Sequence, residues 1–170
     1  MKNSIKILTA LLIVFSFFSC SKDADPVLEI YVSAKQSDLF NNVSLNHGYI
    51  RIWDSNNGGG NIQQYNGAAI AMDLTKEVEP ILIGDESHWA GNFVGLNADL
   101  GNIMLEGVEG NTIKATTRPT YVNEHFGGDF ELEVNKRYRI DFIYDIDASI
   151  IVEDGAFIFD TVVEVIVEEI

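Results

Sequence analysis

Apolar and polar residues alternate with a period of two along most of the chain beyond residue 26. The alternation is clearest over residues 28–34, 138–146 and 157–167. Successive side chains of a β-strand point to opposite faces, so this period is typical of a strand with one buried and one solvated face. In a helix, Asp141 and Asp145 would instead fall within the apolar stripe of 138–146. The pattern therefore predicts strands in all three stretches.

Weaker alternation predicts several further short strands. They lie near residues 43–53, 69–74, 81–83, 93–100, 102–106, 112–117 and 129–134. Residues that accept a positive φ separate the strands, at 56–61, 66–67, 109–111, 127–128 and 154–155. The segment 73–79 is expected to form one or two helical turns, which Pro80 ends.

About eight to ten short strands with glycine turns and no crossover helices indicate an all-β fold. We expect an antiparallel β-sandwich rather than a parallel sheet. Residues 27–170 suit a single domain of this kind, and the apolar content of 46% is enough to bury a core.

The first residues read as a signal for export. Two lysines precede an apolar run over 7–18, which is too short for the roughly 20 residues that a membrane span needs. Cys20, the only cysteine, follows this run and Ser19 in the manner of a bacterial lipoprotein lipobox. We therefore expect a lipoprotein signal peptide over 1–19 and acylation of Cys20, the alternative being ordinary secretory cleavage nearby.

A polar tether, 20–26, is expected between the lipid and the domain. Its stretch SKDADP resembles the export tags of surface-exposed Gram-negative lipoproteins, and a plain hydrophilic linker is the alternative. The expected location is the outer membrane or cell surface of a Gram-negative bacterium, and the side of the membrane stays open. The anchor would tether the protein to the membrane without spanning it.

Charge and cysteine content exclude several classes of partner and site. Beyond residue 19 the chain keeps all 26 acidic side chains and nine of the 11 basic ones, a formal net charge of −17. Nucleic acid is therefore not expected as a partner. A single cysteine excludes an intrachain disulfide and a cysteine-based zinc cluster.

Three segments together resemble a known family. They are DFIYDIDASIIVEDGAFIFDTVVEVI at 141–166, AIAMDLT at 69–75 and HWAGNFVGL at 88–96. They are similar to an uncharacterised family of β-domains in bacterial lipoproteins, catalogued as domain of unknown function 4382. The resemblance spans nearly all of 27–170 and implies an immunoglobulin-like or prealbumin-like sandwich. It carries no catalytic residues over to this chain.

Carboxylates of the predicted strand over 138–146 and of the turn after it are candidate metal ligands. Asp145, Asp147 and Asp154 could converge at one end of the sandwich, and oxygens of this kind suit Ca²⁺, although no D-x-D-x-D-G loop is present. The alternative, which we favour, is a solvated strand face whose aspartates accept hydrogen bonds from turn amides.

Aromatic residues near turns are candidate ligand contacts. Trp53, Trp89 and Tyr121 lie close to glycine or asparagine clusters, where exposed rings can stack on sugar faces. The alternative is that the two tryptophans pack in the core or at its rim.

No catalytic constellation is recognisable. His47, His88 and His125 share no metal-ligand spacing and are expected on the surface or in loops, and no G-x-S-x-G motif occurs. We therefore interpret the protein as non-enzymatic. Two functions remain open, a binding or adhesion module for a glycan or protein, and a structural or accessory lipoprotein that packs on an envelope protein, for example through the edge of 162–167. A glycan-acting enzyme is a third.

Overall fold

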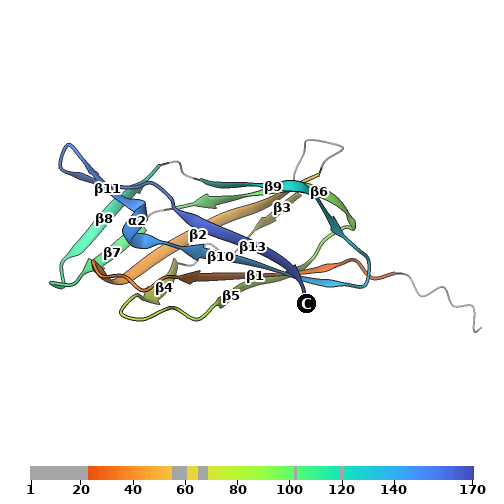
Figure 1. Cartoon of the computed structure of the whole chain (residues 1–170), viewed down its shortest axis with the longest axis horizontal. Helices are drawn as coiled ribbons and strands as arrows, with labels where there is room; N and C mark the ends of the chain where they lie inside the picture. The colour runs from red at the N-terminus through yellow and green to blue at the C-terminus, as the bar shows by residue number, and fades with distance from the viewer. Residues whose placement is uncertain (1–22, 55–60, 65–68, 102, 119–120) are drawn as a thin grey trace, which may run out of the picture.

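A computed structural model describes residues 23–54, 61–64, 69–101, 103–118 and 121–170 (Figure 1). The expected signal peptide and Cys20 lie outside the described residues. Side chains of residues 49, 54, 61–64 and 121–129 are likewise not described.

Thirteen strands and one helical turn make up the described part of the chain. They are β1 (Val27–Ala34), β2 (Phe40–Asp54), β3 (Asn61–Gln64), β4 (Ala69–Asp73), β5 (Ile81–Ser87), β6 (Gly91–Leu100), β7 (Ile103–Gly107), β8 (Thr112–Thr117), β9 (Tyr121–Leu132), β10 (Arg137–Tyr144), α2 (Ile146–Ser149), β11 (Ile150–Glu153), β12 (Ala156–Phe159) and β13 (Val163–Glu169). The all-β sandwich expected from the sequence is confirmed. The strands are more numerous than expected because β3 and β11 were not predicted and the strand expected over 157–167 is divided into β12 and β13.

The first sheet has four strands in the order β5-β1-β10-β13. β1 runs parallel to β10, with Ile30 opposite Ile140 and Val32 opposite Phe142, and it runs antiparallel to β5. β13 completes the sheet antiparallel to β10. Alternate residues of β1 and β10 are fully buried, as their period of two predicts.

The second sheet is built around the long strand β2. β6 and β7 follow one another along one side of β2, since Leu100 pairs with His47 and Met104 with Ser44. β9 and β8 flank β6 and β7 in turn, while β3 and β4 lie on the other side of β2. The hairpin of β11 and β12 extends this sheet through a parallel pairing of β12 with β8.

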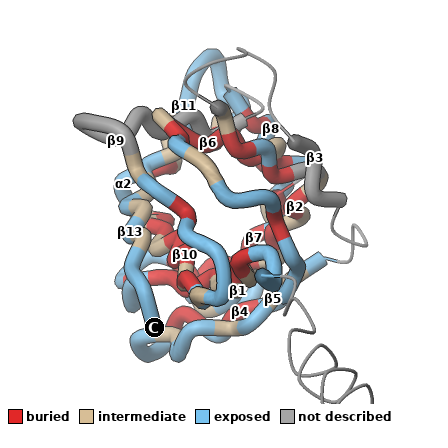
Figure 2. Tube along the Cα trace, turned by 90° about the vertical axis from the view of Figure 1, so that its right-hand side faces the viewer, coloured by how far each residue is buried: buried red, intermediate tan, exposed pale blue. Residues whose placement is uncertain are grey.

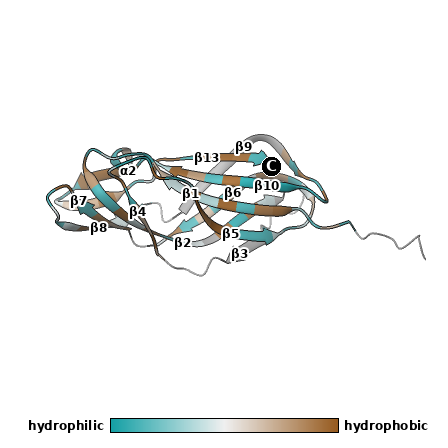
Figure 3. Cartoon of the chain, turned by 90° about the horizontal axis from the view of Figure 1, so that it is seen from below, coloured by the Kyte–Doolittle hydropathy of each residue, from teal (hydrophilic) through white to brown (hydrophobic). Residues whose placement is uncertain are grey.

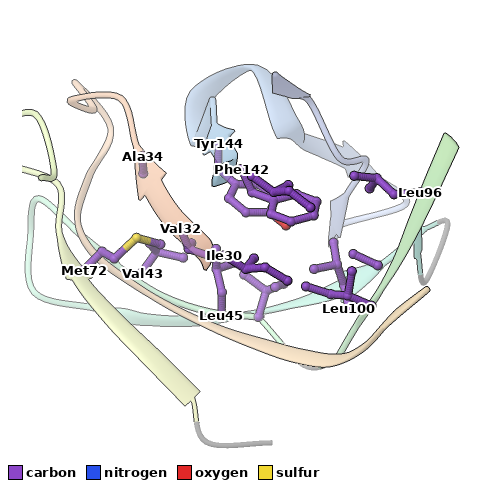
Figure 4. Close-up of a cluster of buried hydrophobic side chains, with 14 of the residues drawn as sticks. Ile30, Val32, Ala34, Val43, Leu45, Met72, Leu96, Leu100, Phe142 and Tyr144 are labelled. Atoms are coloured by element: carbon purple, nitrogen blue, oxygen red, sulfur yellow. The ribbon is translucent and has the colours of Figure 1, made fainter. Parts of the chain in front are cut away.

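The two sheets enclose one apolar core (Figure 4). Side chains from both layers meet there, among them Ile30, Val32, Phe142 and Tyr144 from the first sheet and Val43, Leu45, Leu96 and Leu100 from the second. Each large side chain removed from water in this way contributes roughly 1.5–3 kcal/mol to folding. Seen from below, hydrophobic and hydrophilic residues alternate along the strands (Figure 3).

The strand order differs from that of one sandwich type named above. In the immunoglobulin constant arrangement the first two strands share a sheet. Here β1 and β2 belong to different sheets, and β1 lies between β5 and β10. The immunoglobulin constant-type order is therefore not the one observed.

The molecule is elongated, with different features at its two ends (Figures 1 and 3). One end, called the tether end here, carries residues 23–26, the start of β1 and the C-terminus. The opposite far end carries the β7–β8 turn, α2 and the β11–β12 hairpin.

Three local expectations are wrong. Residues 127–128, expected to form a turn, lie within β9. Residues 74–76 form a turn and not a helical segment, and the strand expected over 157–167 is broken at 160–162 between β12 and β13. Because β12 pairs with the second sheet and β13 with the first, the chain has to change layers at this break.

Candidate functional site

Residues 23–26 are fastened to the turn between β9 and β10 at the tether end. The Ala24 amide donates to Oδ1 of Asn135 at 2.9 Å, and the Asn135 amide donates to the Ala24 carbonyl at 2.8 Å. The Asn135 side-chain amide also donates to the carboxylate of Asp23 at 3.2 Å. Asn135 has a φ of 64°, a left-handed conformation that asparagine adopts more readily than most residues. The last part of the expected tether is thus bound to the domain.

A second contact holds Pro26 beside a cluster of rings. The His88 amide donates to the Pro26 carbonyl at 2.8 Å. The His88 ring stacks on Trp89 with centroids 4.4 Å apart and meets the buried Phe93 edge-on at 5.1 Å. Burial lowers the pKa of His88, and a hydrogen bond to the Trp89 carbonyl and the nearby Asp25 act in the opposite direction.

Three large apolar side chains are exposed at this end. Trp89 is 37% exposed, Val134 in the β9–β10 turn is 40% exposed and Ile170 is 54% exposed. Val134 directly precedes Asn135, and the Ile170 amide donates to the Arg137 carbonyl at 3.0 Å. Figure 2 looks onto this end of the molecule. Tether contacts and exposed apolar groups therefore occur together.

Basic side chains of the tether end are paired with acids. The Lys136 ammonium lies 2.7 Å from a Glu133 oxygen and 2.9 Å from a Glu169 oxygen, and these hydrogen bonds raise the pKa of Lys136. Arg137 pairs with Glu29, whose pKa it lowers. Glu133, Glu169 and Arg137 are about half exposed, so each pair has at least one member in contact with water and contributes little to the stability of the fold.

The outer face of the first sheet carries a more enclosed pair. Arg139 binds both oxygens of Asp141, at 2.6 and 2.7 Å, and Asp141 is buried. The Arg139 guanidinium also lies 4.3 Å from the ring centroid of Tyr31. The hydrogen bond to Asp141 raises the pKa of Arg139, and the bond from Tyr31 to Glu29 raises the pKa of Tyr31. The sequence pattern does not single out Arg139, because a charged residue on a solvated strand face is ordinary.

The aspartates named as candidate calcium ligands have structural roles at the far end. Asp145 caps α2 by accepting from the Ala148 amide at 3.0 Å, and this bond, together with one from Lys35, lowers its pKa. Asp147 accepts hydrogen bonds from the Ser37 hydroxyl and, at 2.9 Å, from the Asp38 amide. These partners occupy the oxygens that a cation would need.

Asp154 serves a third, separate purpose. It lies with Gly155 in the two-residue loop between β11 and β12, at φ values of 50° and 80°, as a type I′ hairpin requires. In the described parts of the chain, no group of three or more His, Cys, Asp or Glu residues could hold a metal ion. Asp145 and Asp147 do accept hydrogen bonds from turn amides, those of Ala148 and Asp38, as the favoured interpretation describes.

The candidate aromatic contacts do not form one surface. Trp53 is half-buried on β2 beside the buried Ile52, so the alternation of the strand directs Trp53 to the outer face of the second sheet. Trp89 instead packs on His88 and Phe93 at the tether end. Tyr121 begins β9, and its side chain lies outside the described residues.

The expectation for the histidines is wrong at His47. This residue lies on β2 with 2% of its surface exposed, and its Nε2 is 2.9 Å from the Tyr144 hydroxyl. Burial lowers the pKa of His47 to about 4. His88 lies in a loop, as expected, but its side chain is buried, and the His125 side chain is not described.

Two cavities among the described residues are small or shallow. A void of about 10 Å³ lies in the core among eight apolar side chains, including Leu28, Phe93 and Ile140, and has room for about one water molecule. An open groove of about 360 Å³ follows the loop from Asp73 to Ile81 between the edges of the two sheets.

Comparison with known proteins yields no assignment. No family model, no curated protein and no solved structure matches the chain. The resemblance to the lipoprotein β-domain family therefore stays an expectation. None of the helices in the described residues has the length and apolar character to cross a membrane.

Proposed function

We propose that the protein is a lipid-anchored, non-catalytic binding protein of the bacterial envelope. The observation that carries the proposal is the attachment of residues 23–26 at one end of an elongated sandwich. An anchor on Cys20 would hold this end close to the membrane and direct the opposite end away from it. The far end is then the part of the molecule best placed to meet a partner.

Exposed apolar side chains on loops support binding at the far end. Leu39 and Val108 are 54% and 60% exposed and belong to neighbouring loops, since the Val108 amide donates to the Leu39 carbonyl at 3.4 Å. Val152 on the β11–β12 hairpin is exposed as well. Loops held by a rigid scaffold commonly carry binding residues. We infer that a protein or glycan is bound here.

The anchor and the binding end are tested separately. Cys20→Ser is expected to move the protein from the membrane fraction to the soluble fraction and to remove the acyl mass from the mature chain. A photo-reactive amino acid at position 108 of the lipidated protein is expected to cross-link a defined envelope component in intact cells, with position 166 on the first sheet as control. Equal labelling from both positions would contradict a binding site at the far end.

A purified partner then allows a quantitative test. The pair of changes Leu39→Ser and Val108→Ser is expected to weaken binding at least tenfold with little change in melting temperature. If the partner is a polysaccharide, Trp89→Ala should leave retention unchanged, because this ring packs on His88 at the tether end, away from the binding loops. Unchanged retention of all variants would contradict the proposal.

The edge of β13 favours a second candidate, an accessory lipoprotein that packs on an envelope protein. Among the described strands, β13 pairs only with β10, which leaves its other side open for strand addition. Glu164 and Glu168 alternate with Ile166 on its exposed face, so a partner strand with basic residues would fit better than a second copy. Val165→Pro would then abolish co-purification with that partner, and unchanged co-purification would contradict this candidate.

A further inference from the structure

We propose that the tether end rests against the lipid surface, with Trp89 and Val134 in the interfacial layer and Ile170 beside them. The inference rests on the proposed anchor at Cys20. It assigns one end of the domain as a membrane-contact surface and lipid as its partner.

The length of free chain is the first argument. Residues are bound to the domain from Asp23 onward, so three residue steps separate Cys20 from the first bound residue. A fully extended chain spans at most about 3.3–3.6 Å per residue, so these steps reach about 10–11 Å. Acyl chains on Cys20 lie in the bilayer, and the tether end is therefore held within about this distance of its surface.

The second argument is the chemistry of the side chains at this end. Tryptophan is enriched at membrane–water interfaces because its ring is apolar and its indole N–H is polar. Trp89 is held by stacking on His88 and yet exposes 37% of its surface. Val134 is exposed in the turn that binds the tether, and the β9–β10 turn fixes it there through Asn135. The short link to Cys20 holds this end close to the bilayer, and its exposed apolar side chains are already in position to contact lipid.

Charge decides how strong this contact can be. A domain with a net charge of −17 is repelled by anionic lipid. At the tether end, the two cations Lys136 and Arg137 offset part of the charge of the three carboxylates of Glu133, Glu169 and Glu29, which lessens the repulsion locally. The contact is therefore expected on lipids of low net charge, with the anchor present, and weaker as anionic lipid is added.

Depth-dependent quenching of tryptophan fluorescence tests the inference. The lipidated protein, made from the full chain and carrying Trp53→Phe, has Trp89 as its only tryptophan. It is reconstituted into vesicles of phosphatidylethanolamine and phosphatidylglycerol, at a ratio of nine to one, that contain lipids brominated near the headgroup. The matched control carries Trp89→Phe and reports Trp53 on the outer face of the second sheet. We expect lipid bromine to quench Trp89 at least twofold more than Trp53.

The outcomes separate the inference from the proposed function. If the protein floats with the vesicles and both tryptophans are quenched equally, the membrane-contact surface is overturned while the anchor stands. If the protein does not float, the anchor fails and the inference fails with it. If Trp89 is shielded without vesicles in a sample that sedimentation shows to be dimeric, a second copy covers this end and the inference is overturned.

A longer connection provides an independent check. Insertion of ten glycine and serine residues between Lys22 and Asp23 leaves the bound segment intact but lets the domain move away from the bilayer. Quenching of Trp89 is expected to fall towards the value of Trp53. If Trp89 is quenched equally with and without the insertion, the short link between Cys20 and Asp23 is not what holds the tether end at the bilayer.

Discussion

The Tyr144 hydroxyl lies 2.9 Å from Nε2 of His47, and this bond joins the two sheets inside the core. Tyr144 comes from β10 of the first sheet and His47 from β2 of the second, and both side chains are almost fully buried. Phe142 meets the imidazole edge-on at 5.4 Å. Nδ1 of His47 has no hydrogen-bond partner among the described residues, so the ring is only half satisfied. A polar pair in this setting makes the core sensitive to pH and to substitution.

The stability of the fold is expected to fall between pH 6.5 and about 4. The pKa of His47 is about 4 in the folded protein and about 6.5 when the chain is unfolded, because burial disfavours the charged ring. The unfolded state therefore binds more protons in this window, and the free energy of unfolding decreases as the pH falls. From the difference between the two pKa values, the loss is at most about 3 kcal/mol. Urea unfolding at a series of pH values measures it.

His47→Gln is the matched control for this pH dependence. Glutamine keeps a polar group near Tyr144 but does not titrate, so the decline between pH 6.5 and about 4 is expected to be much smaller. His88 and the carboxylates whose pKa is lowered in the fold, such as Glu29 and Asp145, contribute the part that remains. Identical slopes in the two proteins would show that His47 does not control the acid sensitivity.

Removal of both members of the pair is expected to cost less than the sum of the two single losses. Tyr144→Phe leaves both nitrogens of His47 without a partner and should lower the free energy of unfolding by about 1–3 kcal/mol. Adding His47→Leu removes the stranded polar ring, so the double variant should be more stable than the sum of the single losses predicts. Equilibrium unfolding of the four proteins gives the coupling, and additive losses would contradict an energetic role of the bond.

The burial of His47 could have been predicted from the alternation of β2, but histidine is usually a surface residue, and this led to the opposite interpretation. Val43, Leu45 and His47 share one phase of the alternation, which points His47 into the core. The buried positions then shift to Ile50 and Ile52, and the structure has an irregular register between His47 and Ile50. The change of phase is the signal of a β-bulge. Histidine's usual place on the surface favoured the wrong interpretation.

Local sequence signals predicted hairpin turns better than they predicted contacts between loops that are distant in the chain. The Asp154-Gly155 pair forms the expected hairpin because both residues have a positive φ, and this conformation depends on the two residue types and not on distant contacts. Asp145 and Asp147 instead depend on Lys35, Ser37 and Asp38, about 110 positions away in the chain. The contact between Ala24 and Asn135 spans 111 positions and is equally invisible to a local pattern. Alternation defines which face of a strand is buried, but not which loops meet.

Arg139→Met is expected to destabilise the fold by about 1–2 kcal/mol. Methionine keeps much of the packing of the stem but leaves the buried Asp141 carboxylate without its two-point partner. The control is Arg118→Met, which breaks a similar two-point pair with Glu153 whose members are 58% and 49% exposed. The control should be clearly less affected, because water replaces an exposed partner. Melting curves compare the two variants, and equal losses would contradict the argument from burial.

The attachment of the tether can be loosened without disturbing the sandwich. Asn135→Gly keeps the left-handed turn, because glycine adopts positive φ without strain, but removes the side-chain bonds to Ala24 and Asp23. The loss of about 1–1.5 kcal/mol of local hydrogen bonding corresponds to roughly tenfold faster exchange of the Ala24 amide with deuterium. Asn111→Gly in the exposed turn after β7 serves as control and should leave that rate unchanged. Protection of Ala24 that persists in Asn135→Gly would mean that other contacts hold residues 23–26. In that case the side chain of Asn135 would not be what fixes this segment to the domain.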